Sequence, residues 1–554
     1  MSGSSLARLP AEEVPSLPIP ATLPLFGQMF VEAIERHRVG QLTEAEALYR
    51  AILAIHPVHA EAAYNLGIVL QTQGRSQDAL GAYHRAILVR PDFADAYANL
   101  GTALQELGQL DESAAALRRA ITLRPDSPMA VCNLGVTLRA QGKFDDAVTA
   151  LDLALSLQPN YDSAYANLGA VLLDQGKAEA ALEACLRAVA ANPHMVIGQC
   201  NLGATYKAMN RLDEAEVAFR QALALQPDLP EPHFGLAQIL LLKGQLHAGW
   251  PEYEWRWKLR DYGWLKALHG DFAQPRWQGE PLDGKTILVY AEQGLGDTMQ
   301  FARFLPEVAA RGGSIIFAVQ PPLVTLLSRL PGITVIPLDR KPLPPFDVYL
   351  PLLSLPHLLN THLEGIPAQI PYLNADPALV ERWRARIGGT GFKVGIVWAG
   401  NPTQRGDRLR SPHLAAMLPL FAVEGVDFIS LQLGAGRADI AANPLPPNVL
   451  DLGPEITDFD DTAAIMASLD LVITSCTAPL HLAGALGIPV WALIPFAPHC
   501  FWMLGRTDSP WYPTLRLFRQ DRAGHDWSGP TGRIAAELAE LTRTATAGAC
   551  LAAQ

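Results

Sequence analysis

The sequence contains little cysteine and no long apolar run. Its 554 residues include six cysteines, and none of these stands in a C-x-x-C pair. Neither a disulfide framework nor a zinc site is therefore indicated, which fits a reducing compartment. No uncharged apolar stretch approaches the ~20 residues that cross a bilayer, and the proline-rich start of the chain lacks the continuous apolar core of a signal peptide. We predict a cytoplasmic protein without a transmembrane segment.

Positive charge is also scarce. The chain has 43 lysines and arginines against 55 acidic residues, which gives a net charge of −12. Because nucleic-acid binding requires a basic surface, we expect no nucleic-acid partner. The full G-x-G-x-x-G fingerprint of dinucleotide-binding folds is absent as well. Asp458, Asp460 and Asp461 cluster before an expected helix, where they are interpreted as capping residues, so no metal site is predicted.

A period of 34 residues dominates the first half of the chain. An Asn-Leu-Gly triplet recurs at this interval, a small residue follows twelve positions after each of its glycines, and prolines recur in phase with both. The prolines are Pro57, Pro91, Pro125, Pro159, Pro193 and Pro227. The pattern resembles the tetratricopeptide repeat (TPR), in which each unit is a pair of antiparallel helices. Since one pair cannot bury its apolar face, the units are expected to stack into a solenoid.

The asparagines of the triplets allow two interpretations. They are Asn65, Asn99, Asn133, Asn167 and Asn201. In one interpretation they form a row on the inner face of the solenoid, where their amides bind the backbone of an extended protein or peptide partner. TPR solenoids that deliver proteins to a sugar-transfer domain show such a row. In the other interpretation, asparagine is simply a frequent consensus residue at this position.

The composition changes after the repeats. A seventh repeat begins at Pro227, and its second helix leads into the aromatic-rich segment GWPEYEWRWKLRD. We predict the following domains: a flexible segment 1–24, a solenoid 25–249, a connector 250–284, a first Rossmann-like lobe 285–375 and a second Rossmann-like lobe 376–545.

Short apolar strands alternate with helices in the two predicted lobes, as is typical of parallel sheets. The expected strands are Ile287–Tyr290, Ser314–Val319, Thr334–Pro337, Val348–Leu350, Val394–Trp398, Phe428–Leu431, Leu471–Thr474 and Val490–Ile494. The predicted fold class is thus an all-helical solenoid followed by two α/β lobes. Ligands bind such sheets at the carboxyl ends of the strands, so the loops after these strands are expected to line a cleft.

Several segments of this half resemble the heptosyltransferase-related glycosyltransferases (family 9, GT-B fold), in particular bacterial proteins in which that domain follows TPRs. The segments are AEQGLGDTMQFARFLPEV, VGIVWAGNP, LDLVITS, TAPLHLAGALGIPVWALIP and GRTDSPWYPTLRLFRQ. The resemblance implies an inverting, metal-independent transfer from a nucleotide-sugar, which is a substrate rather than a cofactor. It places the acceptor on the first lobe and the donor on the second.

The first lobe offers two carboxylates for a general base. Asp297, in the Gly-Leu-Gly-Asp turn after the first strand, matches the proposed base of the resembled family. The alternative is an aspartate that satisfies N–H groups at a helix start. Glu292 is the competing carboxylate, and Gln293, Gly294 and Gly296 complete the expected acceptor loop.

The second lobe offers two groups for the phosphates of the donor. The first is the segment 401–411, in which Asn401, Arg408 and Arg410 match the resembled family and the arginines could clamp phosphate oxygens. Alternatively, this segment is a solvated loop whose arginines, Arg405 among them, pair with Asp407.

The second group is the start of the helix after the strand 471–474. There Ser475, Cys476 and Thr477 precede N–H groups and a helix dipole that suit an anion, and His481 follows one turn later. Relatives usually carry Asp-Thr where this chain has Cys476-Thr477. Trp502, further along the chain, either stacks on the nucleotide base or packs between the lobes.

Two functions follow from these patterns. The first is a glycosyltransferase whose acceptor, a protein, a peptide or a glycan, is recruited by the solenoid. The second is a non-catalytic TPR scaffold with a degenerate nucleotide-sugar-binding lobe, which the cysteine at position 476 would favour.

Overall fold

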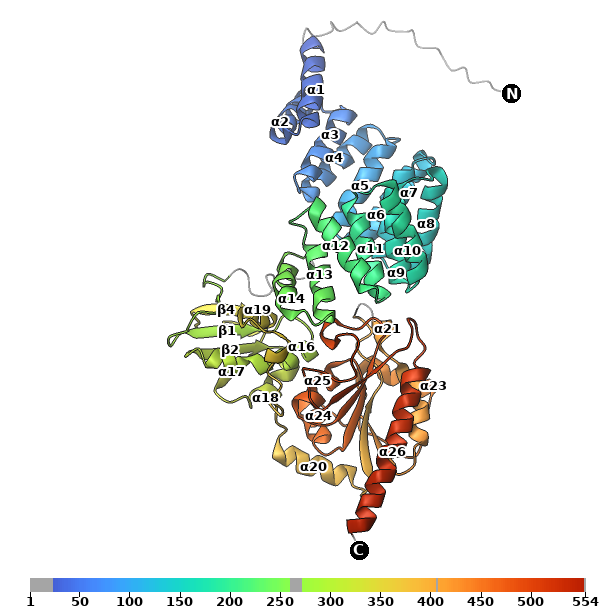
Figure 1. Cartoon of the computed structure of the whole chain (residues 1–554). Helices are drawn as coiled ribbons and strands as arrows, with labels where there is room; N and C mark the ends of the chain where they lie inside the picture. The colour runs from blue at the N-terminus through green and yellow to red at the C-terminus, as the bar shows by residue number, and fades with distance from the viewer. Residues whose placement is uncertain (1–22, 260–271, 405–406, 553–554) are drawn as a thin grey trace, which may run out of the picture. The chain divides into compact units, whose positions relative to one another are not determined.

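The computed structural model describes residues 23–259, 272–404 and 407–552. The chain forms two compact units, Met1–Asn192 and Pro193–Gln554, which are coloured from blue to red along the chain in Figure 1. The predicted flexible segment 1–24 lies almost entirely outside the described residues, as do Arg405 and the centre of the predicted connector.

The first unit consists of antiparallel helix pairs, as the 34-residue period predicts. Its helices are α1 (Leu23–Arg38), α2 (Leu42–Ile55), α3 (Ala60–Thr72), α4 (Ser76–Val89), α5 (Ala94–Glu106), α6 (Leu110–Leu123), α7 (Pro128–Ala140), α8 (Phe144–Leu157), α9 (Asp162–Asp174) and α10 (Ala178–Ala191). The repeated glycine brings the two helices of a pair together. A Cβ atom added to Gly67 in α3 would lie 2.4 Å from the ring of Tyr83 in α4, so only glycine permits this packing.

The second unit begins with four further helices of the same kind. They are α11 (Val196–Ala208), α12 (Leu212–Leu225), α13 (Pro230–Leu242) and α14 (Leu246–Tyr253), followed by the 3-10 turn η1 (Glu254–Lys258). These helices share one hydrophobic core with the α/β part of the unit. For example, the indole N–H of Trp250 donates to the carbonyl of Thr361 at 3.1 Å, and the Leu504 N–H donates to the Leu242 carbonyl at 3.1 Å.

The α/β part contains two sheets in which the strands pair in parallel. The first sheet has the order β3-β2-β1-β4 and the second has the order β10-β9-β8-β5-β6-β7. The strands are β1 (Thr286–Tyr290), β2 (Ser314–Val319), β3 (Ile333–Pro337), β4 (Val348–Pro351), β5 (Phe392–Val397), β6 (Val426–Ser430), β7 (Val449–Asp451), β8 (Leu471–Ser475), β9 (Val490–Ile494) and β10 (Leu515–Arg519). Each expected strand is present, with ends that differ by one or two residues, and the prediction of parallel α/β sheets is confirmed.

Two strands escaped prediction, and both are edge strands of the second sheet. β7 is only three residues long, and β10 has the sequence LRLFR, in which arginines interrupt the apolar run. Edge strands are commonly short or charged because these features discourage pairing with other chains. The apolar pattern that marks a central strand is therefore weakest at the edges.

Four helical segments position the loops discussed below. α16 (Leu295–Phe301) follows β1, α25 (Ala478–Ala485) follows β8, and these two helices pack against each other. The short helix α21 (Asp407–Arg410) follows β5, and the 3-10 turn η9 (Cys500–Trp502) follows β9. In Figure 1, α16 and α25 lie between the two sheets.

The remaining short elements connect the strands. They are η3 (Ala302–Phe304), α17 (Leu305–Ala309), η4 (Pro321–Leu323), α18 (Val324–Leu327), η5 (Leu352–Ser354), α19 (Leu355–Leu358), η6 (Leu363–Gly365), α20 (Pro377–Ile387), α22 (His413–Met417), η7 (Leu418–Ala422), η8 (Gly434–Ala438), α23 (Asp439–Ala442), α24 (Phe459–Met466) and α26 (Ser528–Ala552). α24 begins behind Asp458, whose side chain accepts the Asp461 N–H. Asp458 thus caps the helix as expected, whereas the side chains of Asp460 and Asp461 are buried and form ion pairs with Arg329 and Arg382, both at 2.7 Å.

Candidate functional site

Asp297 lies in the first turn of α16. Its Oδ2 accepts the backbone N–H of Gly294 at 3.0 Å, so the side chain caps the helix, as one interpretation of the sequence expects. The residue is only partly buried. Burial, with a smaller contribution from the negative charge of Glu292, raises the pKa of the Asp297 carboxyl to about 6 against the opposing effects of the Gly294 N–H and the charge of Arg410. A carboxyl with this pKa can gain and lose a proton near neutral pH, as a general base must.

Glu292 holds a different position in the same loop. Its carboxylate has no exposed surface and forms a two-pronged ion pair with Arg256 of η1, with both N···O distances at 2.9 Å. The Leu353 N–H also donates to it, at 2.8 Å. Because its oxygens accept hydrogen bonds within the protein and are shielded from solvent, Glu292 is poorly placed to compete with Asp297 as a general base. It anchors the loop to the end of the helical part.

Gln293, the next residue of the loop after β1, strengthens this anchor. The Gln293 amide donates to the Tyr253 hydroxyl at 2.8 Å, and the Gln293 carbonyl accepts from Gln320 at 2.7 Å. Tyr253 is the last residue of α14. The loop that carries Asp297 is therefore tied to the last TPR-like helix by a hydrogen bond as well as by an ion pair.

The two lobes touch beside Asp297. A Cβ atom added to Gly296 would lie 2.5 Å from Cδ2 of His481, so the backbone of the first lobe rests on the imidazole of the second. The sequence predicted an open crevice at this place. The structure shows contact at Gly296, with the partly exposed Asp297 directly next to it.

His481 is buried in α25 with 8% of its surface exposed. Its Nδ1 lies 3.1 Å from the hydroxyl of Tyr512, and the Arg303 guanidinium of the first lobe lies 4.4 Å from the centre of the Tyr512 ring. Burial lowers the pKa of His481 to about 3, and the charges of His499, Arg303 and Arg410 act in the same direction. The imidazole is therefore neutral at physiological pH and can donate or accept a hydrogen bond without charge.

Cys476 is also buried, with 9% exposed. Its sulfur accepts the indole N–H of Trp502 at 2.9 Å. Burial raises the pKa of the thiol to about 11, so the group stays neutral at physiological pH. Trp502 itself is 2% exposed and its ring centre lies 5.3 Å from that of His481, which matches the interpretation that it packs inside the protein.

The start of α25 offers fewer donors than the sequence suggested. Among the described residues, the Thr477 N–H donates to the Ser475 carbonyl at 2.8 Å and the Leu480 N–H donates to the Thr477 carbonyl at 3.0 Å. Pro479 has no N–H. The predicted anion seat therefore depends on the Ala478 N–H, the helix dipole and nearby side chains. The Ser475 hydroxyl oxygen is buried there without a hydrogen-bond partner in the described chain.

Arg410 supplies the positive charge at this site. Its Nε donates to Asp407 at 3.0 Å and its terminal nitrogen donates to Gln404 at 2.9 Å. A Cβ atom added to Gly400 would lie 2.9 Å from Cγ2 of Thr477 and 3.1 Å from the Arg410 guanidinium. The loop after β5 and the loop after β8 therefore meet, and Arg410 lies at the meeting point.

The electrostatic contacts of Arg410 define the site. Its charge acts on Asp297 of the first lobe and on Cys476 and His481 of the second. The structure thus brings these four residues together with Gly296 and Thr477. Asn401 and Arg408 lie on the exposed side of the same loop, where the Asn401 side chain accepts from Thr403 at 2.9 and 3.1 Å.

The asparagine row is engaged in contacts between helices. The side-chain amide of Asn99 donates to the Tyr64 hydroxyl at 3.1 Å, and that of Asn133 donates to the Thr102 hydroxyl at 3.1 Å. These partners belong to the preceding repeat. Asn167 donates to the Ser163 carbonyl at 2.8 Å, within its own helix.

The two remaining asparagines, Asn65 in the first unit and Asn201 in the second, are partly buried. Within the row, the amides of Asn99 and Asn133 therefore contribute to the stacking of repeats. The role of the row in peptide binding stays a prediction.

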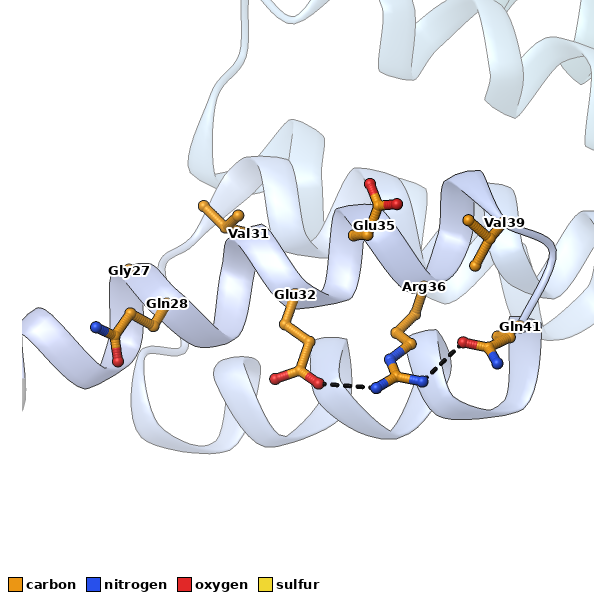
Figure 2. A pocket seen from close by; sticks show the side chains of 8 residues that line it. All are labelled: Gly27, Gln28, Val31, Glu32, Glu35, Arg36, Val39 and Gln41. Carbon is orange, nitrogen blue, oxygen red and sulfur yellow. Dashed lines mark hydrogen bonds and ion pairs between the residues drawn. The ribbon is translucent and has the colours of Figure 1, made fainter.

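A separate depression of about 800 Å³ lies along α1 in the first unit. Figure 2 shows its lining: Arg36 joins Glu32 to Gln41, while Val31 and Val39 are exposed. The polar groups are thus paired on the surface of one helix, and the depression has no converging catalytic groups.

Sequence reasoning assigned no role to Arg256 or Arg303, and it noted Tyr512 only as part of a segment that resembles the glycosyltransferases. Arg256 is fully buried, and the signal that could have found it is a lone arginine in the aromatic run EYEWRWK. Arg303 lies two residues beyond the end of α16, and its contact with Tyr512 joins segments that are far apart in the sequence. No local pattern could reveal that pair.

Comparisons with known proteins address mainly the helical part. Residues 30–75, 64–128 and 132–196 match one model of the tetratricopeptide repeat, and residues 196–229 match another. The prediction of TPRs is therefore confirmed. In the described ranges, no helix combines the length and the apolar character that crossing a bilayer would demand.

Protein FlbA of Caulobacter vibrioides is 31% identical to this chain over 350 residues, which are 57% of this chain and 56% of FlbA. The chain thus spans about half the length of that relative. Among solved structures, PilF of Pseudomonas aeruginosa is similar to 38% of this chain and covers 95% of its own length, with 21% identity and a TM-score of 0.33. A thermophilic TPR protein of Thermus thermophilus is similar to 33% of the chain over its whole length, with 23% identity and a TM-score of 0.31.

Proposed function

We propose that this chain is a glycosyltransferase that moves a sugar from a nucleotide-sugar to a hydroxyl of a protein or peptide held by its TPRs. The observation that carries the proposal is Asp297, a partly exposed carboxyl with a pKa of about 6 that shares one site with the guanidinium of Arg410. In this proposal, the two parallel sheets are the acceptor and donor lobes of a GT-B fold.

The reaction requires a base and a stabilised leaving group. The Asp297 carboxylate takes the proton of the acceptor hydroxyl as its oxygen attacks the anomeric carbon. The bond between that carbon and the phosphate oxygen breaks on the opposite side, which inverts the configuration. Arg410, the Ala478 N–H and the α25 dipole stabilise the departing phosphate. His481, which is neutral, contributes a hydrogen bond rather than a charge.

The helical part has a defined place in this proposal. Arg256 and Tyr253 fasten the Asp297 loop to the end of the TPR helices. A polypeptide that lies along these helices is thereby led to the loop that holds the base. TPR solenoids commonly offer extended surfaces for other proteins, which supports a protein or peptide acceptor over a free glycan.

A second function is a non-catalytic scaffold that binds a nucleotide-sugar. Two observations favour it. The Cys476 thiol is tied to Trp502 where relatives usually carry an aspartate, and Gly296 rests directly on His481. In that case the TPRs recruit partners and the α/β part only senses the nucleotide-sugar.

One experiment separates the two functions. The purified chain is incubated with UDP-, GDP-, ADP- and CMP-linked sugars and with cell-lysate acceptors, and the released nucleotide is measured. We expect release with one donor class and a loss of about 10²- to 10⁴-fold in Asp297→Asn, because general-base catalysis contributes that much, with donor binding retained.

The matched control is Asp376→Asn. Asp376 also caps a helix, since it accepts the N–H groups of Ala378 and Leu379, and its replacement is expected to leave release unchanged. Donor binding without release across the whole panel, or equal release by wild type and Asp297→Asn, would contradict the proposed transferase.

A further inference from the structure

Lys207 is a cation whose partner is neutral. It lies in the last turn of α11, is partly buried, and donates to the side-chain oxygen of Gln238 in α13. Within the described residues, no carboxylate forms an ion pair with it. Burial lowers the pKa of its ammonium group, because the charged form loses hydration, and the nearby Cys500 opposes this shift.

A nearby lysine, Lys243, has carboxylate partners that compensate for the burial of its charge. The ammonium of Lys243, which follows α13, lies 2.6 Å from the carboxylate of Asp213 and 2.5 Å from that of Glu216. Lys207 has three N–H donors and the structure records an amide oxygen as its acceptor. A bound carboxylate would complete the coordination that Lys243 finds within the protein.

Lys207 faces the segment that leads to the proposed transfer site. Asn210, just beyond α11, donates to the carbonyl of Phe496. Lys207 and Arg410 both lie within electrostatic reach of His499, and Lys207 and Asp297 both lie within reach of Cys500. Helix α13, which carries Gln238, also packs against η9 (Cys500–Trp502), so Lys207 lies near the segment that Asp297 and Arg410 also influence.

The position of Lys207 indicates which chemical group would bind next to it. In the proposed function, the donor phosphates belong beside Arg410. A group next to Lys207 lies on the TPR helices and close to the loop of Asp297, as a residue of the bound acceptor would. We propose that Lys207 is a subsite for an acidic side chain, Asp or Glu, near the hydroxyl of the acceptor polypeptide that receives the sugar. This inference rests on the proposed function and adds the sequence preference of the acceptor.

The test measures peptide binding without any sugar donor. Fluorescein-labelled peptides carry a central serine in a Gly/Ala background with one Glu placed at each flanking position in turn, and each has a twin with Gln at that place. Binding to the full chain is followed by fluorescence anisotropy at low salt. We expect one Glu peptide to bind about tenfold more tightly than its Gln twin, because hydrogen bonds between charged groups add roughly that factor.

Three variants sharpen the test. Lys207→Met keeps the apolar stem and is expected to erase the Glu preference. Lys207→Glu should instead favour a third peptide, in which Lys stands in place of that Glu. The matched control Lys177→Met removes an exposed lysine next to α10 and should keep the preference of the wild type. Circular dichroism of each variant checks that it is folded.

The outcomes are decisive in both directions. The inference is overturned if wild type binds none of the peptides, shows no Glu preference, or keeps that preference in Lys207→Met. Nucleotide release measured in parallel keeps the proposed function separate. A Glu preference without release counts against transfer alone, and release without a Glu preference counts against the subsite alone.

Discussion

The contacts within the repeat helices join residues that are close in the sequence, whereas those at the proposed transfer site join residues that are far apart in it. In the first unit, Gly67 packs on Tyr83 and Asn99 bonds to Tyr64, so each contact links neighbouring helices. In the second unit, Asp297, Arg410 and Cys476 follow three separate strands, β1, β5 and β8, of the two sheets and share one electrostatic environment. A repeat can therefore be altered with local effects, whereas one change at the site affects several distant segments.

The largest expected effect comes from breaking the ion pair of Arg256. Arg256→Met leaves the Glu292 carboxylate buried without its partner, and removal of one member of a buried pair costs about 3–5 kcal/mol. The matching change in the repeats is Arg75→Met, whose exposed pair with Glu46 at 2.9 Å contributes about 0–1 kcal/mol.

Tryptophan fluorescence during urea unfolding reports on the second unit, which contains Arg256, separately from the first unit, which contains Arg75. All 11 tryptophans of the chain lie between Trp250 and Trp527, which places them in the second unit. We expect the tryptophan transition to shift strongly in Arg256→Met and to stay in place in Arg75→Met. Equal shifts in the two variants would show that the Arg256 pair does not stabilise the second unit as described.

Two glycine-to-alanine substitutions are expected to change the free energy of unfolding by smaller amounts. Gly296→Ala places a methyl group 2.5 Å from the His481 ring, and such overpacking costs about 1–3 kcal/mol. Gly81→Ala in α4 meets no atom within 4 Å and should stabilise that helix by roughly 0.5–1 kcal/mol. Thermal unfolding followed by circular dichroism checks both signs. A neutral Gly296→Ala would mean that the two lobes separate readily at this contact.

The smallest effect is expected from the asparagine row. Asn133→Ala removes the hydrogen bond to Thr102 and should cost about 1 kcal/mol. If the row also holds the acceptor, the triple replacement of Asn99, Asn133 and Asn167 by Ala weakens acceptor capture and leaves donor turnover nearly unchanged. Anisotropy with the peptide set measures capture, and equal capture by wild type and the triple variant would limit the row to a structural role.

The same difference in range explains how much the sequence predicted. The 34-residue period revealed the repeats because a solenoid contacts only its neighbours, and the apolar runs revealed the central strands. Asp297 and Arg410 were found through the resemblance of their segments. The ion pair of Glu292 with Arg256 and the contact of Gly296 with His481 could not be predicted. Each joins segments that only the folded second unit brings together.

The most direct test of the central claim is the pH dependence of nucleotide release. Asp297 acts as a base only when ionised, so release by wild type should be constant above about pH 6 and fall about tenfold per pH unit below it. In Asp297→Asn, release should be low and nearly independent of pH across this range. Because the raised pKa reflects a cost of the ionised form in the folded state, this variant should also unfold at a higher temperature than wild type at about pH 8, and not at about pH 4. The same pH profile in wild type and Asp297→Asn would contradict the assignment of Asp297 as the base.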